Sequence, residues 1–186
     1  MLWISLHLPE LPLEALLRGS PLPEALAVAD NHRIVACDGK ARSRGVRAGM
    51  SASAALALAP QLRICLRDAS AETEALLGAA AWAMQFTPNV ALEFPDAVLL
   101  EISGSLKLFG GLAQIVGDLR EGLAAMGFTA CVSVAPTARA ACWLVRAGGA
   151  RARSPAARAS ARCLRRDRGA ARSRGLGHAV HAERRS

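Results

Sequence analysis

The sequence has no pair of cysteines spaced closely enough to form a CxxC motif. Its five cysteines are scattered and odd in number, which argues against both a disulfide framework and a zinc site. The N-terminus lacks a basic region, and Pro9 and Pro12 interrupt its apolar segment, so a signal peptide is not expected. No stretch offers the roughly 18 uninterrupted apolar residues of a membrane span. These absences favour a cytoplasmic protein with no membrane contact.

Acidic residues are scarce in only one part of the chain. The formal net charge of the 186 residues is +8, which is typical of a nucleic-acid binder. Residues 150–186, however, contain eleven arginines and two acids, whereas residues 1–149 contain twelve basic and thirteen acidic side chains. The basic character of the chain therefore belongs to its C-terminal tail.

The tail at residues 150–186 also lacks aromatic residues and any hydrophobic period. It consists mainly of Arg, Ala, Gly and Ser, and it cannot bury enough apolar surface to order itself, so we predict disorder. Out-of-frame reading of a GC-rich gene produces the same composition, because the codons of these residues are GC-rich. We therefore hypothesise that the tail is a frameshift product rather than a nucleic-acid-binding arm.

Residues 1–149 alternate between strand and helix patterns. Strands are predicted at residues 2–7, 25–29, 33–36, 62–66, 89–94, 98–102 and 129–134. Helices are predicted at residues 10–17, 40–44, 51–59, 70–86, 112–126 and 137–146. Local signals add a hairpin turn at Asp30-Asn31, helix caps at Ser51 and Ser70, a turn at Gly110-Gly111, and core positions for Trp82, Phe86 and Trp143.

Without residues 8–69, the predicted order is strand, helix, strand, strand, helix, strand. This βαββαβ order is that of a ferredoxin-like layer, which belongs to the α+β class. Residues 1–7 and 70–149 would form the layer, and residues 8–69 would be a small inserted subdomain.

Three segments carry a resemblance to a known family: ADNHRIVACDGKARSRGVRAGMSASAALALAP, PDAVLLEISGSLKLFGG and VSVAPTARAACWLVRAGG. In order and spacing they resemble the fingers, the catalytic hairpin and the last palm helix of Y-family (translesion) DNA polymerases. LPLEALL and LEISGSLKLFGG are most similar to the ImuB-type accessory members of that family. The resemblance covers residues 1–149, and it implies that residues 8–69 are the fingers and the rest of this region is the palm.

The resemblance also locates the family's metal site. Active members hold two Mg²⁺ ions with acids at the end of the first strand and an Asp-Glu pair at the hairpin. The matching positions here are Ser5 and His7 in the strand, and Asp96 and Ala97 in the hairpin. Only Asp96 is acidic. We therefore expect no catalytic residue, no metal site and no cofactor, with Asp96 at most a remnant ligand. Mg²⁺ would be needed only by an active polymerase.

Several residues have two interpretations. Arg42, with Lys40 beside it, matches the fingers arginine that contacts phosphate, but it could equally be one of several solvated charges. Asp96 is either a remnant ligand or a turn residue that accepts hydrogen bonds from nearby backbone donors. His7 is either a ligand or a residue whose hydrogen bonds are satisfied within the fold.

The resemblance implies a non-catalytic scaffold in damage-induced (SOS) mutagenic translesion repair. Its implied partners are DNA, a replicative-type error-prone polymerase, a sliding clamp and a RecA-like accessory protein, although the regions that contact the proteins lie outside the matched segments. DNA affinity depends largely on phosphate contacts, so we expect weak binding by the near-neutral residues 1–149. Two alternatives remain open: an active error-prone polymerase, and a non-functional truncated fragment.

Overall fold

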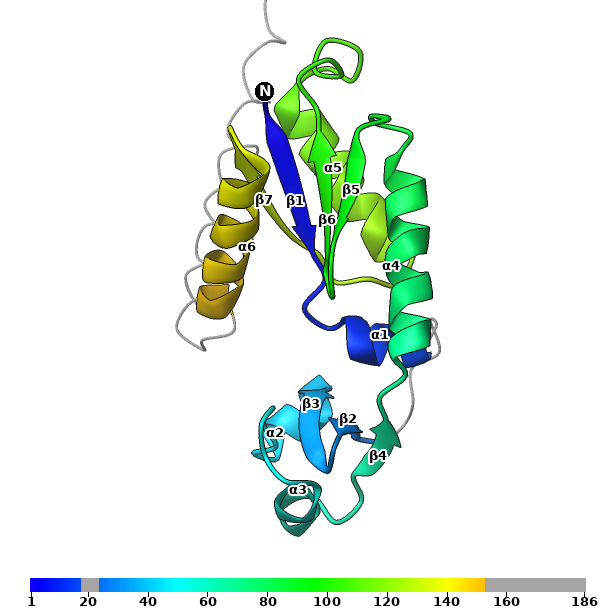
Figure 1. The fold of residues 1–186 in the computed structure, drawn as a ribbon. Coiled ribbons are helices and arrows are strands. Elements are labelled where there is room, and N and C mark those ends of the chain that lie inside the picture. The colour runs from blue at the N-terminus through cyan, green and yellow to red at the C-terminus, as the bar shows by residue number, and fades with distance from the viewer. Residues whose placement is uncertain (18–23, 153–186) are drawn as a thin grey trace, which may run out of the picture. The chain divides into compact units, whose positions relative to one another are not determined.

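The computed structural model describes residues 1–17 and 24–152 (Figure 1). The chain divides into two units, Met1–Arg146 and Ala147–Ser186. Both sheets lie in the first unit, and the last helix, residues 138–152, begins in the first unit and continues into the second. Disorder is predicted for residues 150–186. Of these, residues 153–186 lie outside the described part of the chain. No helix within residues 1–17 and 24–152 is both long and apolar enough for a transmembrane span.

The larger sheet has four strands in the order β5-β6-β1-β7, and every neighbouring pair is antiparallel. Its strands and their two crossover helices are β1 (Trp3–His7), α4 (Ala69–Ala83), β5 (Val90–Glu93), β6 (Ala97–Glu101), α5 (Leu112–Ala125) and β7 (Cys131–Ala135). This strand order is that of a ferredoxin-like layer. The predicted α+β class with a βαββαβ layer is therefore confirmed, and we call this part the palm.

The two faces of the palm sheet differ in chemistry because side chains alternate along each strand. Ile4 and Leu6 of β1 lie in a core cluster with residues of α4 and α5. Within this cluster the rings of Trp82 and Phe86 meet edge to face at 5.5 Å, so the core position predicted for both is confirmed. Ser5 and His7 point to the opposite face of the sheet.

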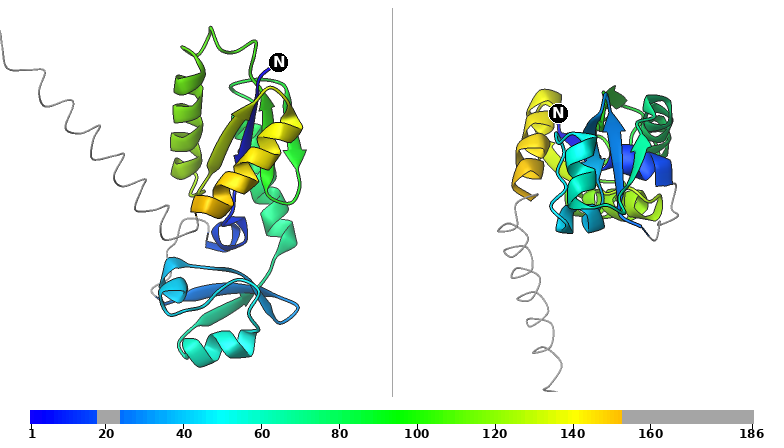
Figure 2. Two further views of the ribbon diagram at one scale, coloured as in Figure 1. Left: turned by 90° about the vertical axis from the view of Figure 1, so that its left-hand side faces the viewer. Right: turned by 90° about the horizontal axis from the view of Figure 1, so that it is seen from below.

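That opposite face is covered by α6 (Ala138–Ala152), on the other side of the sheet from α5 (Figure 2). Of its residues 138–148, whose burial is described, Ala141, Cys142 and Val145 are buried. The helix is longer than the sequence predicted, since it continues past residue 146 and includes the first residues assigned to the tail. Trp143 is 70% exposed, so the prediction that it belongs to the core is wrong. Helical spacing places it on the side of α6 away from the sheet.

The smaller sheet, which we call the fingers, has the strand order β3-β2-β4, with β2 antiparallel to β3 and parallel to β4. Its elements are β2 (Leu26–Asp30), β3 (Arg33–Cys37), α2 (Gly39–Ser43), α3 (Ala52–Leu58) and β4 (Arg63–Leu66). The hairpin turn lies at Asn31 and His32, whose φ angles are 47° and 63°, one residue later than predicted. Both residues adopt the left-handed conformation that two-residue hairpin turns require.

Helix α1 (Leu11–Leu17) contributes to both cores. Leu11 belongs to the palm cluster, whereas Leu13 belongs to a cluster with Leu26 and Val28 of the fingers strand β2. The Glu14 side chain of the same helix accepts a hydrogen bond of 2.9 Å from the backbone N–H of Thr129, just before β7. Helix α1 therefore joins the two sheets through apolar and polar contacts.

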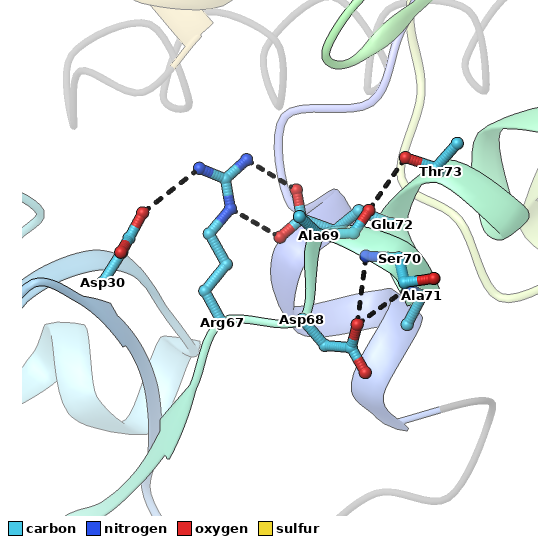
Figure 3. A network of polar contacts seen from close by, with 8 residues as sticks. All are labelled: Asp30, Arg67, Asp68, Ala69, Ser70, Ala71, Glu72 and Thr73. Atoms are coloured by element: carbon cyan, nitrogen blue, oxygen red, sulfur yellow. Dashed lines mark hydrogen bonds and ion pairs between the residues drawn. The ribbon is translucent and has the colours of Figure 1, made fainter.

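A charged cluster marks the second connection, between β4 and α4 (Figure 3). Arg67 donates two hydrogen bonds of 2.8 Å to the carboxylate of Glu72, and its Nη1 lies 3.6 Å from Asp30 Oδ2. The cap of α4 is Asp68, which accepts hydrogen bonds from the backbone N–H groups of Ser70 and Ala71. The predicted cap at Ser70 is wrong, because the earlier aspartate reaches these donors, whereas the predicted cap at Ser51 is confirmed.

Candidate functional site

The residues that the resemblance matches to the family's metal-site positions meet at one end of the palm sheet. Strand β1 ends at His7, which pairs with Ala97 of β6 on one side and with Cys131 of β7 on the other. Asp96 occupies the turn before β6, and its backbone carbonyl accepts a hydrogen bond of 2.8 Å from Leu8 N–H. The structure therefore brings His7, Asp96 and Ala97 together, and Ser5 lies two residues before His7 on β1.

Two basic side chains hold the Asp96 carboxylate. His7 Nε2 lies 3.2 Å from Asp96 Oδ2, and Arg146 Nη2 lies 3.3 Å from Asp96 Oδ1. Each carboxylate oxygen thus has its own cationic partner. Asp96 is a turn residue, as one interpretation had it, but its side chain contacts His7 of β1 and Arg146 of α6 rather than backbone donors of the turn. His7 matches the interpretation as an internally satisfied residue only in part, because Nε2 contacts Asp96 whereas the buried Nδ1 has no hydrogen-bond partner among the described residues.

The ionisation of this group follows from the contacts. The hydrogen bond to Asp96, with a smaller contribution from Cys131, raises the pKa of His7 to about 9 in spite of its burial. Burial acts to raise the pKa of Asp96, but the hydrogen bond and charge of His7, together with Arg146, lower it overall. At neutral pH the group is therefore an imidazolium, a carboxylate and a guanidinium.

The other family-site positions offer no metal ligand of the kind Mg²⁺ prefers. Ser5 is fully buried, and its hydroxyl donates to Cys142 Sγ of α6 at 4.0 Å. Ala97 is buried and apolar. The carboxylate of Glu101 lies at the far end of β6, where it accepts from the backbone N–H of Ser103. In the described ranges, no group of three or more His, Cys, Asp or Glu side chains could hold a metal ion.

The donor chemistry therefore does not fit the family's two Mg²⁺ ions. Two such ions need several hard oxygen ligands in near-octahedral shells. Asp96 is the one carboxylate at these positions, and both of its oxygens already contact positive charge.

Arg42 and Lys40, the candidate phosphate contacts, lie on α2 of the fingers. Arg42 donates from Nε and Nη2 to the Cys37 carbonyl, at 2.9 and 2.7 Å, and its Nη2 lies 2.8 Å from Glu10 Oε2. The Arg42 guanidinium is thus engaged in contacts that fix α2 to β3 and to the start of α1. Lys40 is exposed.

The sequence did not single out Arg146 as part of this site. A signal was nevertheless present, because Arg146 lies one turn after the buried Cys142, at the edge of the sheet-facing side of α6. What sequence spacing cannot show is that this edge of α6 reaches a hairpin 50 residues earlier in the chain.

Comparison with solved structures identifies the class of fold. A ternary complex of Dbh has a TM-score of 0.63 and 17% identity, covering 74% of this chain and 42% of that one. DinB from Sulfolobus solfataricus has a TM-score of 0.58 and 18% identity, covering 74% and 42%. At these identities the likeness shows the fold, which is that of a Y-family polymerase palm with fingers.

Sequence comparison then gives the family. Residues 13–144 match the model of the impB/mucB/samB family, and the chain belongs to this family. Protein ImuB of two Caulobacter vibrioides strains is 38% identical over 104 residues, covering 56% of this chain and 23% of the relative. The chain thus spans about a quarter of the length of these curated relatives. The resemblance inferred from the sequence is confirmed.

Proposed function

We propose that this protein is a non-catalytic polymerase homologue that acts as a scaffold for DNA and protein partners in damage-induced (SOS) mutagenic translesion repair. The observation that carries this proposal is the engagement of Asp96, the one acid at the family-site positions, by His7 and Arg146. Family membership and the likeness to ImuB support the connection with translesion synthesis.

Electrostatics supports the non-catalytic part of this proposal. Nucleotidyl transfer of this class needs metal ions to activate the attacking hydroxyl and to hold the triphosphate. At this position the protein supplies its own positive charges, from His7 and Arg146, and they are directed at the carboxylate. A metal ion at Asp96 would have to displace both of these side chains, so we assign no catalytic residue and no cofactor.

The proposed partners follow from the family. They are DNA, a replicative-type error-prone polymerase, a sliding clamp and a RecA-like accessory protein, and the proposed location is the cytoplasm. Residues 1–149 have a net charge of −1, so we expect them to contribute little electrostatic affinity for DNA.

Primer extension tests the proposal. The full chain, with a primed template and dNTPs, is assayed with Mg²⁺ and separately with Mn²⁺, alongside Asp96→Ala as the matched variant. We expect no template-dependent incorporation above background from either protein. Incorporation by the unmodified chain that Asp96→Ala abolishes would establish the alternative, an active error-prone polymerase with relocated ligands.

A further inference from the structure

Helix α6 exposes an aromatic residue that the palm core does not use. Trp143 is 70% exposed and the adjacent Leu144 is 55% exposed. By contrast, Trp82 packs against the palm core, where its ring fills the space that a Cβ at position 122 would need. An indole left in water on a helix whose other side is fully packed is a candidate contact surface.

The surroundings of Trp143 are basic. Arg139 lies one turn before it on α6 and is exposed, and Arg146 lies three residues after it. The contact of Arg146 with Asp96 uses Nη2, one of the nitrogens of a guanidinium that carries five N–H donors. Residues 138–152 contain no acidic side chain. The outer face of α6 therefore combines one flat aromatic surface with positive charge.

We propose that this face of α6 binds single-stranded DNA, with a base stacked on Trp143 and the neighbouring phosphates near Arg139 and Arg146. The inference rests on the proposed function, since it supplies a DNA contact for a chain proposed to work on DNA. An indole stacks on any base, and arginines beside it are suited to the backbone phosphates.

Two features favour a single strand over other partners. Bases in a duplex are stacked on one another and do not present a free face, whereas an unpaired base does. A protein helix would need several apolar anchors in register, but the positions one turn from Trp143 are Arg139 and Ala147. The charge and the single ring together fit a polyanion that carries planar groups.

The experiment measures the affinity of the full chain for a short labelled oligothymidylate by fluorescence anisotropy. Trp143→Ala is expected to weaken binding roughly 5- to 150-fold, the range measured for loss of one stacked base. The matched control is Leu144→Ala, which removes an exposed apolar side chain at the next position and should change the affinity less than twofold. Residues 150–186, with eleven arginines, contribute a salt-dependent affinity in every variant, so the comparison is repeated at high salt, where that contribution falls.

Three results would overturn the proposal. These are equal binding by Trp143→Ala and the unmodified chain, an equal effect on a duplex of the same length, and an equal effect on polyglutamate. The last would indicate an acidic protein partner. Circular dichroism of Trp143→Ala checks that the variant is folded, and Trp143→Phe, which keeps a ring, should restore part of the affinity. A negative result in this binding assay would not change the primer-extension result. The failure of this proposal can therefore be distinguished from the failure of the proposed function.

Discussion

The palm and the fingers are stabilised by different kinds of contact. The palm core contains large side chains such as Ile4, Leu6, Leu100 and Leu119, all fully buried. Of the ten buried residues in the main fingers cluster, six are alanines. A buried Leu or Ile contributes about 1.5–3 kcal/mol, and an alanine removes far less apolar area from water. The palm can therefore rely on apolar packing in a way that the fingers cannot.

The fingers compensate through their attachments. Helix α1 covers one side of the sheet with Leu13, and charged contacts fix both ends of the subdomain: Arg42 with Glu10, and Arg67 with Glu72. We therefore expect the alanine-rich fingers to depend on their neighbours more than the leucine-rich palm does. Substitutions at each kind of contact test whether the stabilities of the palm and the fingers differ in this way.

The largest effect is expected from the palm core. Leu6→Ala should lower the free energy of unfolding by about 2–5 kcal/mol, because it removes a fully buried side chain and leaves a cavity. Urea denaturation measures the change. The control is Leu66→Ala, at a position that is 82% exposed, which should change little. If Leu6→Ala lowered the free energy of unfolding by no more than Leu66→Ala does, apolar packing would not be the main stabilising contribution in the palm.

A somewhat smaller effect is expected at the connection between fingers and palm. Arg67→Ala leaves the carboxylate of Glu72, which is 5% exposed, without its bidentate partner, and should destabilise the protein by about 1–3 kcal/mol. Hydrogen exchange should show the fingers amides opening more than the palm amides. The control is Arg63→Ala, at an exposed position on β4, the strand that ends just before Arg67. Equal opening of both regions would contradict the difference drawn between them.

The His7–Asp96 pair in the palm should make the free energy of unfolding depend on pH. The pKa of His7 is about 9 in the folded protein and 6.5 for a free side chain, as in the unfolded chain, so its stabilisation is complete below pH 6.5 and is lost as the pH rises through 9. Partial solvent screening reduces the loss to roughly 1–2 kcal/mol. Urea unfolding between these pH values measures it, and His7→Gln should flatten the profile. A flat profile in the unmodified protein would show that the His7–Asp96 pair contributes nothing.

Much of the fold follows from sequence because its signals are local. The strand and helix periods, the Ser51 cap and the turn before β6 each lie within a few residues, and their order predicts the palm layer. The resemblance to Y-family polymerases predicted where Asp96 would lie. The resemblance assigned His7 and Asp96, which are 89 residues apart, to one site but did not predict that they pair, and Arg146, 50 residues from Asp96, was not predicted at all. Trp143 was misassigned because hydrophobicity indicates a buried residue whether or not a neighbouring element covers it.

The central claim is that Asp96 is held by protein cations and is not a metal ligand. Titration of the full chain with Mn²⁺, followed by electron paramagnetic resonance, tests this most directly when Asp96→Asn is measured in parallel. We predict that the two proteins bind Mn²⁺ identically, with no site that depends on Asp96. A Mn²⁺ site that is present in the unmodified chain and lost in Asp96→Asn would contradict the claim.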